Sequence, residues 1–153
     1  MIPISEILLP GHVNLSLTGK DQAAGIDELL VKFNGDPRVI NCDALVQAVT
    51  ERNAPAISCN GVGVCIAHGR TNAVQSLVMA AGRSEKGLVS PEIREKVRLV
   101  FVAGIPSAFD SEYLRIVGSI ARFCRDKELL DKVLKAPTPD DFITLLSRQE
   151  VKL

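Results

Sequence analysis

The segment NGVGVCIAHGR, from Asn60 to Arg70, places His68 at the end of an apolar run and directly before Gly69. A histidine with one ring nitrogen held by a backbone carbonyl presents the lone pair of its other nitrogen as an attacking group. The glycine that follows lets another surface approach closely and leaves backbone N–H groups for an anion. This arrangement suits a histidine that accepts a phosphoryl group.

Phosphoryl transfer depends chiefly on positive charge and hydrogen-bond donors around the phosphoryl oxygens. The sequence offers guanidinium groups on Arg52 and Arg70 and the hydroxyl of Ser58. Each has an ordinary interpretation as well, the arginines as solvated surface residues and the serine as a loop residue bonded to its own backbone. His68 could also simply end a strand with one ring nitrogen bonded to backbone. The residue types alone leave both interpretations open.

Three other chemistries fit this segment less well. A dinucleotide loop of the form G-x-G-x-x-G needs a glycine at position 66, where the chain has Ile66, and the lysine of a Walker loop is also missing. Cys59, Cys65 and His68 do not complete a tetrahedral metal site, and odd spacing puts residues 65 and 68 on opposite faces of one strand. A cysteine nucleophile would need a base from a distant part of the chain. We therefore predict no metal and no cofactor.

Composition narrows the class of protein. The chain has 153 residues, 18 basic and 18 acidic side chains, and 4% aromatic residues. Its length fits a single domain over residues 1–153, and zero net charge with few aromatics argues against nucleic-acid binding. Apolar runs are far shorter than the ~20 residues needed to cross a bilayer, and the N-terminus lacks a signal-peptide pattern. We expect a cytoplasmic protein without a membrane span, whose four cysteines are reduced thiols used in packing.

The first third of the chain shows a strand followed by two helices. Period-two alternation predicts a strand over Val13–Leu17, and Thr18 with Asp21 resembles a capping box that opens a helix. A second helix is expected to begin near Asn41 or Asp43 and must end before Pro55, because proline cannot continue a helix.

Strand patterns dominate the middle of the chain and helical patterns the end. The runs VGVCIA, SLVMAAG and KVRLVFVAGIP are short, apolar and separated by Gly, Asn and Ser, which is typical of buried strands. Helical spacing returns from Ser111, and Thr138, Pro139 and Asp141 form the start of a last helix. Helices before and after a set of strands predict an α/β fold, a single mixed β-sheet flanked by α-helices.

The segment ERNAPAISCNGVGVCIAHGR resembles, without a gap, the core of the type-2 enzyme IIA domains of the bacterial phosphoenolpyruvate-dependent phosphotransferase system (PTS). This is the fructose and mannitol class, which includes the nitrogen-regulatory branch. Arg52 falls on the family's arginine, and His68 follows sixteen positions later on its histidine. Ser58 takes the family's threonine position, and Gly69 and Arg70 complete its H-G-R motif. The resemblance extends over about residues 4–146.

This resemblance implies a mannitol/fructose-type IIA fold and a set of roles. His68 would accept a phosphoryl group from the histidine phosphocarrier HPr and pass it to an enzyme IIB domain. Arg52 and Ser58 would support the transfer, and Gly69 and Arg70 would bind the phosphate. An alternative is a nitrogen-regulatory-type IIA signalling module, in which phosphorylation controls binding to a regulatory target protein. A further alternative is a degenerate binding domain that is not phosphorylated.

The chain also departs from the family pattern at other positions. Ala67 replaces the proline before the histidine, which frees a backbone dihedral and adds an N–H to be satisfied. Cys59 and Val62 replace a glycine and an asparagine, so we expect positive φ values in the turn before the strand to cost more conformational energy. Tyr113 occupies the position of the family's second histidine. A phenol can donate a hydrogen bond but, with a reference pKa of ~10, does not become a cation.

Overall fold

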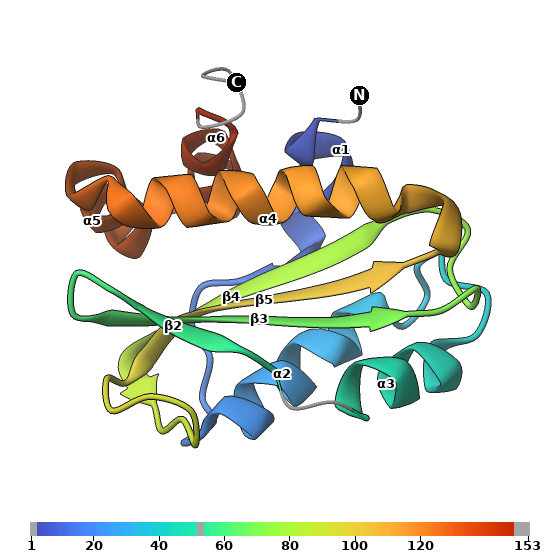
Figure 1. The fold of residues 1–153 in the computed structure, drawn as a ribbon, viewed down its shortest axis with the longest axis horizontal. Coiled ribbons are helices and arrows are strands. Elements are labelled where there is room, and N and C mark those ends of the chain that lie inside the picture. The colour runs from blue at the N-terminus through green and yellow to red at the C-terminus, as the bar shows by residue number, and fades with distance from the viewer. Residues whose placement is uncertain (1–2, 52–53, 149–153) are drawn as a thin grey trace.

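A five-stranded sheet forms the centre of the protein (Figure 1). The computed structural model describes residues 3–51 and 54–148. Its strands are β1 (Val13–Asn14), β2 (Ala56–Cys59), β3 (Val62–Arg70), β4 (Val78–Leu88) and β5 (Val97–Ile105). Their order is β1-β4-β5-β3-β2. The pairs β1/β4 and β3/β5 are parallel, whereas β4/β5 and β2/β3 are antiparallel. The predicted single mixed sheet is confirmed.

Helices cover both faces of this sheet, with α4, α5, α6 and α1 on one face and α2 and α3 on the other (Figure 1). The α-helices are α1 (Ile4–Ile7), α2 (Gln22–Leu30), α3 (Cys42–Thr50), α4 (Asp110–Arg125), α5 (Lys127–Lys135) and α6 (Pro139–Ser147). Short 3-10 turns lie at η1 (Pro10–His12), η2 (Val31–Phe33) and η3 (Ser107–Phe109). No helix within the described ranges is long and apolar enough to cross a membrane.

Two of the predicted helix starts are confirmed. The Asn41 side chain caps α3 by accepting a hydrogen bond from the backbone N–H of Ala44 at 3.1 Å. At α6, the hydroxyl of Thr138 accepts from the N–H of Asp141 at 3.1 Å and donates to its carboxylate at 2.9 Å. Both arrangements satisfy backbone donors that the first turn of a helix leaves unpaired.

The predictions for residues 13–21 are partly wrong. The strand ends at Asn14, because the N–H of Ser16 bonds at 2.9 Å to the Asn14 side chain in a local turn. Asp21 does cap α2, but Thr18 takes no part. Its hydroxyl donates instead to the carboxylate of Glu28, further along α2, at 2.9 Å. Short polar side chains can hydrogen-bond to the backbone of either a turn or a helix start, so the sequence pattern alone does not identify their partners.

A β-hairpin that the sequence patterns did not predict joins β2 to β3. Its turn places Asn60 at φ 52° and Gly61 at φ 84°. Two successive residues with positive φ are typical of the type I′ turn, for which Asn-Gly is the favoured pair. The expectation that Cys59 and Val62 would disturb this turn is therefore wrong, because the positive φ values fall on the two residues between them.

A buried ionic cluster ties the N-terminal segment to the loop before α3. Asp36 accepts a 2.7 Å bond from the Arg38 guanidinium and lies 3.2 Å from Nε2 of His12. The same guanidinium donates to the backbone oxygen of Ile7 at 3.2 Å, and the His12 ring stacks on Phe33. The cluster therefore connects α1, η1 and η2 around one carboxylate.

Protonation of His12 is expected to destabilise the fold. Burial lowers the pKa of His12 below its ordinary value of 6.5, outweighing the opposing effect of Asp36. Because the folded state holds this proton less tightly than the unfolded state, stability is lost as the pH falls below about 6.5. Chemical denaturation at pH 7 and pH 5.5 should show a larger loss of stability in the wild type than in His12→Gln. Equal losses in the two proteins would contradict this prediction.

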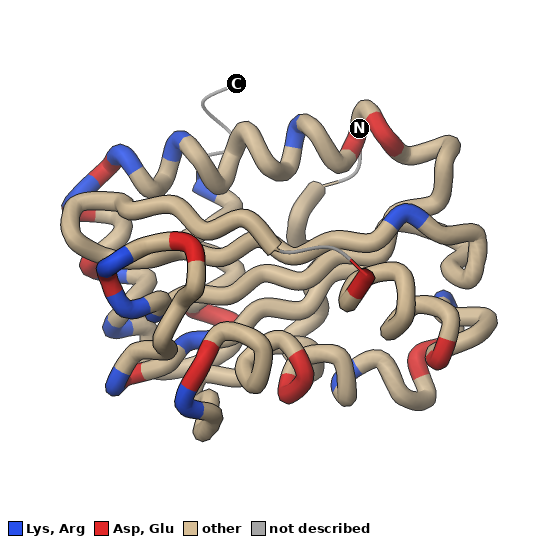
Figure 2. The backbone as a smooth tube through the Cα atoms, turned by 60° about the horizontal axis from the view of Figure 1, so that its bottom comes forward, with Lys and Arg blue, Asp and Glu red and all other residues tan. Residues whose placement is uncertain are grey.

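Charged residues of both signs lie around the sheet, and few of them lie along the middle of its strands (Figure 2). Lys and Arg are most concentrated at the end of the molecule where β3 begins, at the left of Figure 2. The other end of β3 carries His68, Gly69 and Arg70.

Candidate active site

His68 lies near the end of β3, on the face of the sheet covered by α4. Side chains alternate between the two faces of a strand. Val64 and Ile66 belong to the core beneath α4, whereas Cys65 and Ala67 belong to the core beneath α2 and α3. His68 follows the first pair and is half-buried. The odd spacing thus puts Cys65 and His68 on opposite faces, as predicted.

Tyr113, from the first turn of α4, lies directly against the His68 ring. The two ring centroids are 5.1 Å apart and the ring planes are tilted by 41°. Burial raises the pKa of Tyr113 to about 12, so its hydroxyl stays protonated at neutral pH and keeps its donor. The residue at the family's second-histidine position therefore lies against His68, and its hydroxyl is a neutral hydrogen-bond donor.

A pocket of about 360 Å³ opens beside these two rings. Its walls are His68, Arg70, Ile105, Asp110, Tyr113 and Leu114. Arg70 is two residues after His68 and therefore on the same face of β3. Its guanidinium bonds at 3.0 Å to the carboxylate of Asp110, with 67% of the Arg70 side chain exposed. Exposed ion pairs of this kind contribute only about 0–1 kcal/mol, so the guanidinium can exchange partners at little cost.

The pocket also lies at the beginning of α4. This helix is 16 residues long and starts at Asp110. The first turn of a helix carries unpaired N–H groups and a partial positive charge, both of which favour an anion. Arg70, the Tyr113 hydroxyl and this helix start can together receive an oxyanion next to the His68 ring.

Gly69 points away from this pocket, toward α3. A Cβ at this position would lie 2.6 Å from the carbonyl carbon of Ala48 and from the nitrogen of Val49. The absence of a side chain thus allows α3 to pack against β3. Successive N–H groups of a strand also alternate in direction, and that of Thr71 donates to Ile105 of β5. The N–H of Gly69 therefore points toward β5 as well, so the predicted phosphate contact of Gly69 is not supported by its placement.

The structure does not bring Ser58 to the pocket. Ser58 pairs with Gly63 across the β2/β3 hairpin, five residues before His68, or roughly 17 Å along the strand. Paired residues share a face, and position 63 lies on the α2/α3 face. The expected support of His68 by Ser58 is therefore wrong in its geometry: the hairpin register directs this side chain to the other face. Arg52 lies outside the described residues, and its role stays a prediction.

Ala67 is accommodated without the proline of the family pattern. It pairs with Val102 in the ladder between β3 and β5 and is buried against the α2/α3 core. Its added N–H points to the same side as that of Thr71, toward β5, where the ladder provides acceptors. The strand pairing thus orients the backbone before His68 in place of a proline ring.

Asp110 was missed by the sequence patterns. It opens α4 three residues before Tyr113 and holds the guanidinium of Arg70. An aspartate in the first turn of a helix is also expected because its carboxylate interacts favourably with the helix dipole, so its residue type gives no separate signal of a site. Only the three-dimensional proximity of the two chain segments shows its second role.

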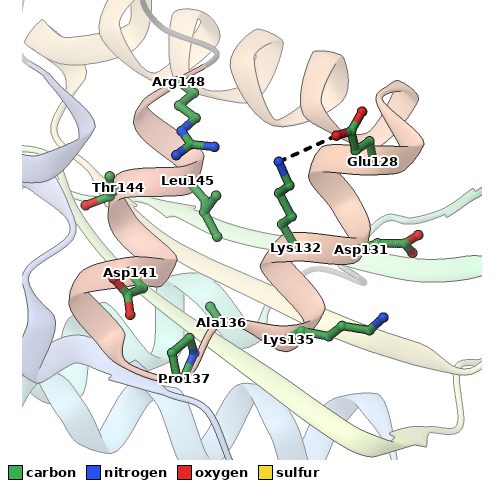
Figure 3. A pocket seen from close by; sticks show the side chains of 10 residues that line it. All are labelled: Glu128, Asp131, Lys132, Lys135, Ala136, Pro137, Asp141, Thr144, Leu145 and Arg148. Carbon is green, nitrogen blue, oxygen red and sulfur yellow. Dashed lines mark ion pairs between the residues drawn. The ribbon is translucent and has the colours of Figure 1, made fainter.

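Another hollow lies elsewhere, between α5 and α6 (Figure 3). Its volume is about 570 Å³, and it contains none of the predicted site residues. Side chains of both charges line it, including Lys132 and Glu128, which form a 3.6 Å ion pair. Within the described ranges, no group of three or more His, Cys, Asp or Glu side chains is placed to hold a metal ion.

Sequence comparisons place the chain in a known family. Residues 6–149 match the family described as phosphoenolpyruvate-dependent sugar phosphotransferase system, EIIA 2. The "PTS system fructose-specific EIIA component" of Haloferax volcanii is 30% identical over 100 residues, 65% of each chain. The "PTS system fructose-specific EIIABC component" of Bacillus subtilis is 21% identical over 148 residues, which are 96% of this chain and 23% of that protein. The chain therefore spans less than two thirds of either relative.

Solved structures show the same fold. The nitrogen regulatory protein IIA-Ntr from Neisseria meningitidis matches with a TM-score of 0.80 at 19% identity, covering 94% of this chain and 98% of that one. The IIA mannitol protein from Escherichia coli matches with a TM-score of 0.67 at 17% identity, covering 89% and 96%. With the family match over nearly its whole length and this shared fold, the chain belongs to the EIIA type 2 family of the phosphoenolpyruvate-dependent sugar phosphotransferase system.

Proposed function

We propose that the protein is a phosphocarrier in which His68 accepts a phosphoryl group from an HPr-like protein and passes it to a IIB domain. The observation that supports this most directly is the convergence of His68, Arg70 and Tyr113 on one open pocket. In the incoming transfer a ring nitrogen of His68 forms a bond to phosphorus as the bond from phosphorus to the donor breaks. The same ring later becomes the leaving group toward the IIB domain.

The surrounding groups suit the charge that moves in this reaction. Three oxygens of the transferred group carry negative charge, and donors placed around them lower the barrier more than covalent assistance does. Arg70 supplies a positive charge, released from Asp110, and Tyr113 supplies a neutral donor. Arg52, which the family resemblance places at this site, would add a second cation. Leu114, with 68% of its surface exposed at the rim, offers an apolar contact to a docking protein.

Two relatives support the carrier over the regulatory alternative. The Haloferax volcanii relative, 30% identical over 65% of this chain, bears a fructose-specific name. A structurally similar protein, with a TM-score of 0.71, is the IIA half of a solved complex of enzyme IIAMTL and phosphorylated enzyme IIBMTL from Escherichia coli. A IIB domain is therefore the partner that we infer for the outgoing transfer.

Phosphate labelling tests the proposal. The purified protein should be incubated with phosphoenolpyruvate, enzyme I and HPr, and then assayed for acid-labile phosphate, with omission of HPr as the control. Labelled protein is next mixed with fructose-type and mannitol-type IIB domains. Label that moves to a IIB domain supports the carrier, and label that stays on the protein favours the signalling module. A protein that takes up no label would be the degenerate binding domain.

Replacing Tyr113 by phenylalanine is expected to slow labelling by roughly 10- to 150-fold, since a hydrogen bond to a charged group contributes about 1.5–3 kcal/mol. The aromatic ring and its packing against His68 remain, so the melting temperature should stay close to that of the wild type. Initial rates of label uptake and thermal melts measure the two effects separately. An unchanged rate would reduce Tyr113 to a packing residue.

A further inference from the structure

Two cysteines from distant parts of the chain meet near the beginning of β3. Cys59 ends β2, Cys124 lies in the last turn of α4, and their thiols hydrogen-bond to each other. The side chain of Asn60 also donates to the backbone oxygen of Cys124 at 3.2 Å. The hairpin turn and the end of the helix are therefore held together beside the two sulfur atoms.

This contact follows from the hairpin register. Cys59 pairs with Val62 and therefore points to the same face as Val64, beneath α4. Both thiols are well buried, with exposed fractions of 8% for Cys59 and 2% for Cys124. A disulfide has an S–S distance of about 2.05 Å, so thiols already in hydrogen-bond contact need only a short approach.

A cavity of about 330 Å³ gives small molecules access to the pair. Both cysteines line it, together with Ile57, Asn60 and Arg125. Ile57, Asn60 and Arg125 are exposed, so the cavity communicates with solvent. A small uncharged oxidant can therefore reach sulfur atoms that larger reagents cannot.

The other two cysteines have different surroundings. Cys65 lies on the opposite face of the sheet, where burial raises the pKa of its thiol to about 12. Cys42 lies at the start of α3 and its thiol donates to the side chain of Asn34 at 3.1 Å. Neither residue lines the cavity beside Cys59, so they provide internal controls for selective chemistry.

We propose that Cys59 and Cys124 form an intramolecular disulfide when the protein meets hydrogen peroxide. The sulfur of Cys59 attacks one peroxide oxygen, the O–O bond breaks, and a sulfenic acid and one water form. The thiol of Cys124 then displaces the sulfenic hydroxyl, which leaves as a second water, and the S–S bond closes. The pair loses two electrons and two protons, and the peroxide gains them.

The order of these steps follows from the surroundings of the two thiols. Burial raises the pKa of Cys124, and contact with Cys59 adds to this effect, so Cys124 remains a thiol and acts second. The resulting bond joins the end of β2 to the end of α4. Because the cross-link closes a long loop of the unfolded chain, it should raise the melting temperature by roughly 5 °C or more.

Thiol counting and peptide mapping of the full-length protein test the proposal. Native protein is treated with hydrogen peroxide, denatured, and alkylated with iodoacetamide. The expected result is a fall from four free thiols to two, with one cross-linked peptide pair containing Cys59 and Cys124. Dithiothreitol should restore all four thiols and the original melting temperature, and Cys42→Ser should still form the cross-link.

Other outcomes would overturn the proposal. These are a thiol count that stays at four, a loss that begins at Cys42, a bond between two chains, or oxidation of Cys59 that dithiothreitol does not reverse. Cys59→Ser should form no intramolecular disulfide, and a melting temperature unaffected by peroxide is expected for it. Because the peptide map uses wild-type protein, the result does not depend on whether this variant folds.

Discussion

Replacing His68 by glutamine is expected to abolish phosphate labelling by phosphoenolpyruvate, enzyme I and HPr. Glutamine is polar and similar in length, so it preserves the end of β3, but it has no ring nitrogen with a nucleophilic lone pair. Arg70 and Tyr113 would remain in the pocket, and they carry no group that can replace it at neutral pH. Acid-labile label, measured at equal protein concentration, gives the result directly.

The other histidine of the chain provides a matched control. His12 is bonded to Asp36 in the cluster that holds the N-terminal segment and does not line the pocket. His12→Gln should therefore keep full labelling at pH 7 while His68→Gln loses it. Thermal melts should show that His68→Gln remains folded. Acid-labile label that persists in folded His68→Gln would place the acceptor elsewhere and refute the proposed function.

Replacing Gly69 by alanine is expected to lower the free energy of unfolding by about 1–3 kcal/mol, the usual cost of overfilling a packed core. The added Cβ would lie 2.6 Å from backbone atoms of Ala48 and Val49, and backbone cannot rotate away as a flexible side chain can. Either α3 or β3 must shift. Urea denaturation at neutral pH, followed by circular dichroism, measures the loss.

Gly11 is the control for this substitution. A Cβ at Gly11 meets nothing within 4 Å, and its φ is not in the positive range, so Gly11→Ala should change stability by only a few tenths of a kcal/mol. An unfolding free energy of Gly69→Ala equal to that of the wild type would show that α3 can shift away from β3 at little energetic cost. The function of Gly69 would then have to be sought in its backbone and not in the packing of α3.

The sheet and the central residue of the site could be predicted from the sequence because their signals are local. Buried strands give uninterrupted apolar runs, and the cap at Thr138 is encoded within four residues. The position of His68 at a strand end also follows from its immediate neighbours. The placement of Tyr113 beside it required the family resemblance, since the contact joins β3 to α4.

Other features depended on register and on contacts between distant segments. The linear pattern places Ser58 at the site, but its face is decided by the Asn60-Gly61 turn, which the sequence patterns do not predict. The pairing of Arg70 with Asp110 and the contact of Cys59 with Cys124 each link β-structure to one end of α4. The spacing of residues along one strand or helix carries no information about contacts between distant segments.

The two outer strands of the sheet are also its shortest, and their length affects how other chains can associate with the edges of the sheet. β1 has two residues and β2 has four, whereas the three inner strands have nine to eleven. Short outer strands offer few open backbone groups to a second copy, which discourages edge-to-edge association. Among the described residues, strand pairing with β2 stops at Ala56 and Cys65, so His68 lies on a stretch of β3 beyond this edge. A visiting protein can therefore approach that stretch of β3 from the side.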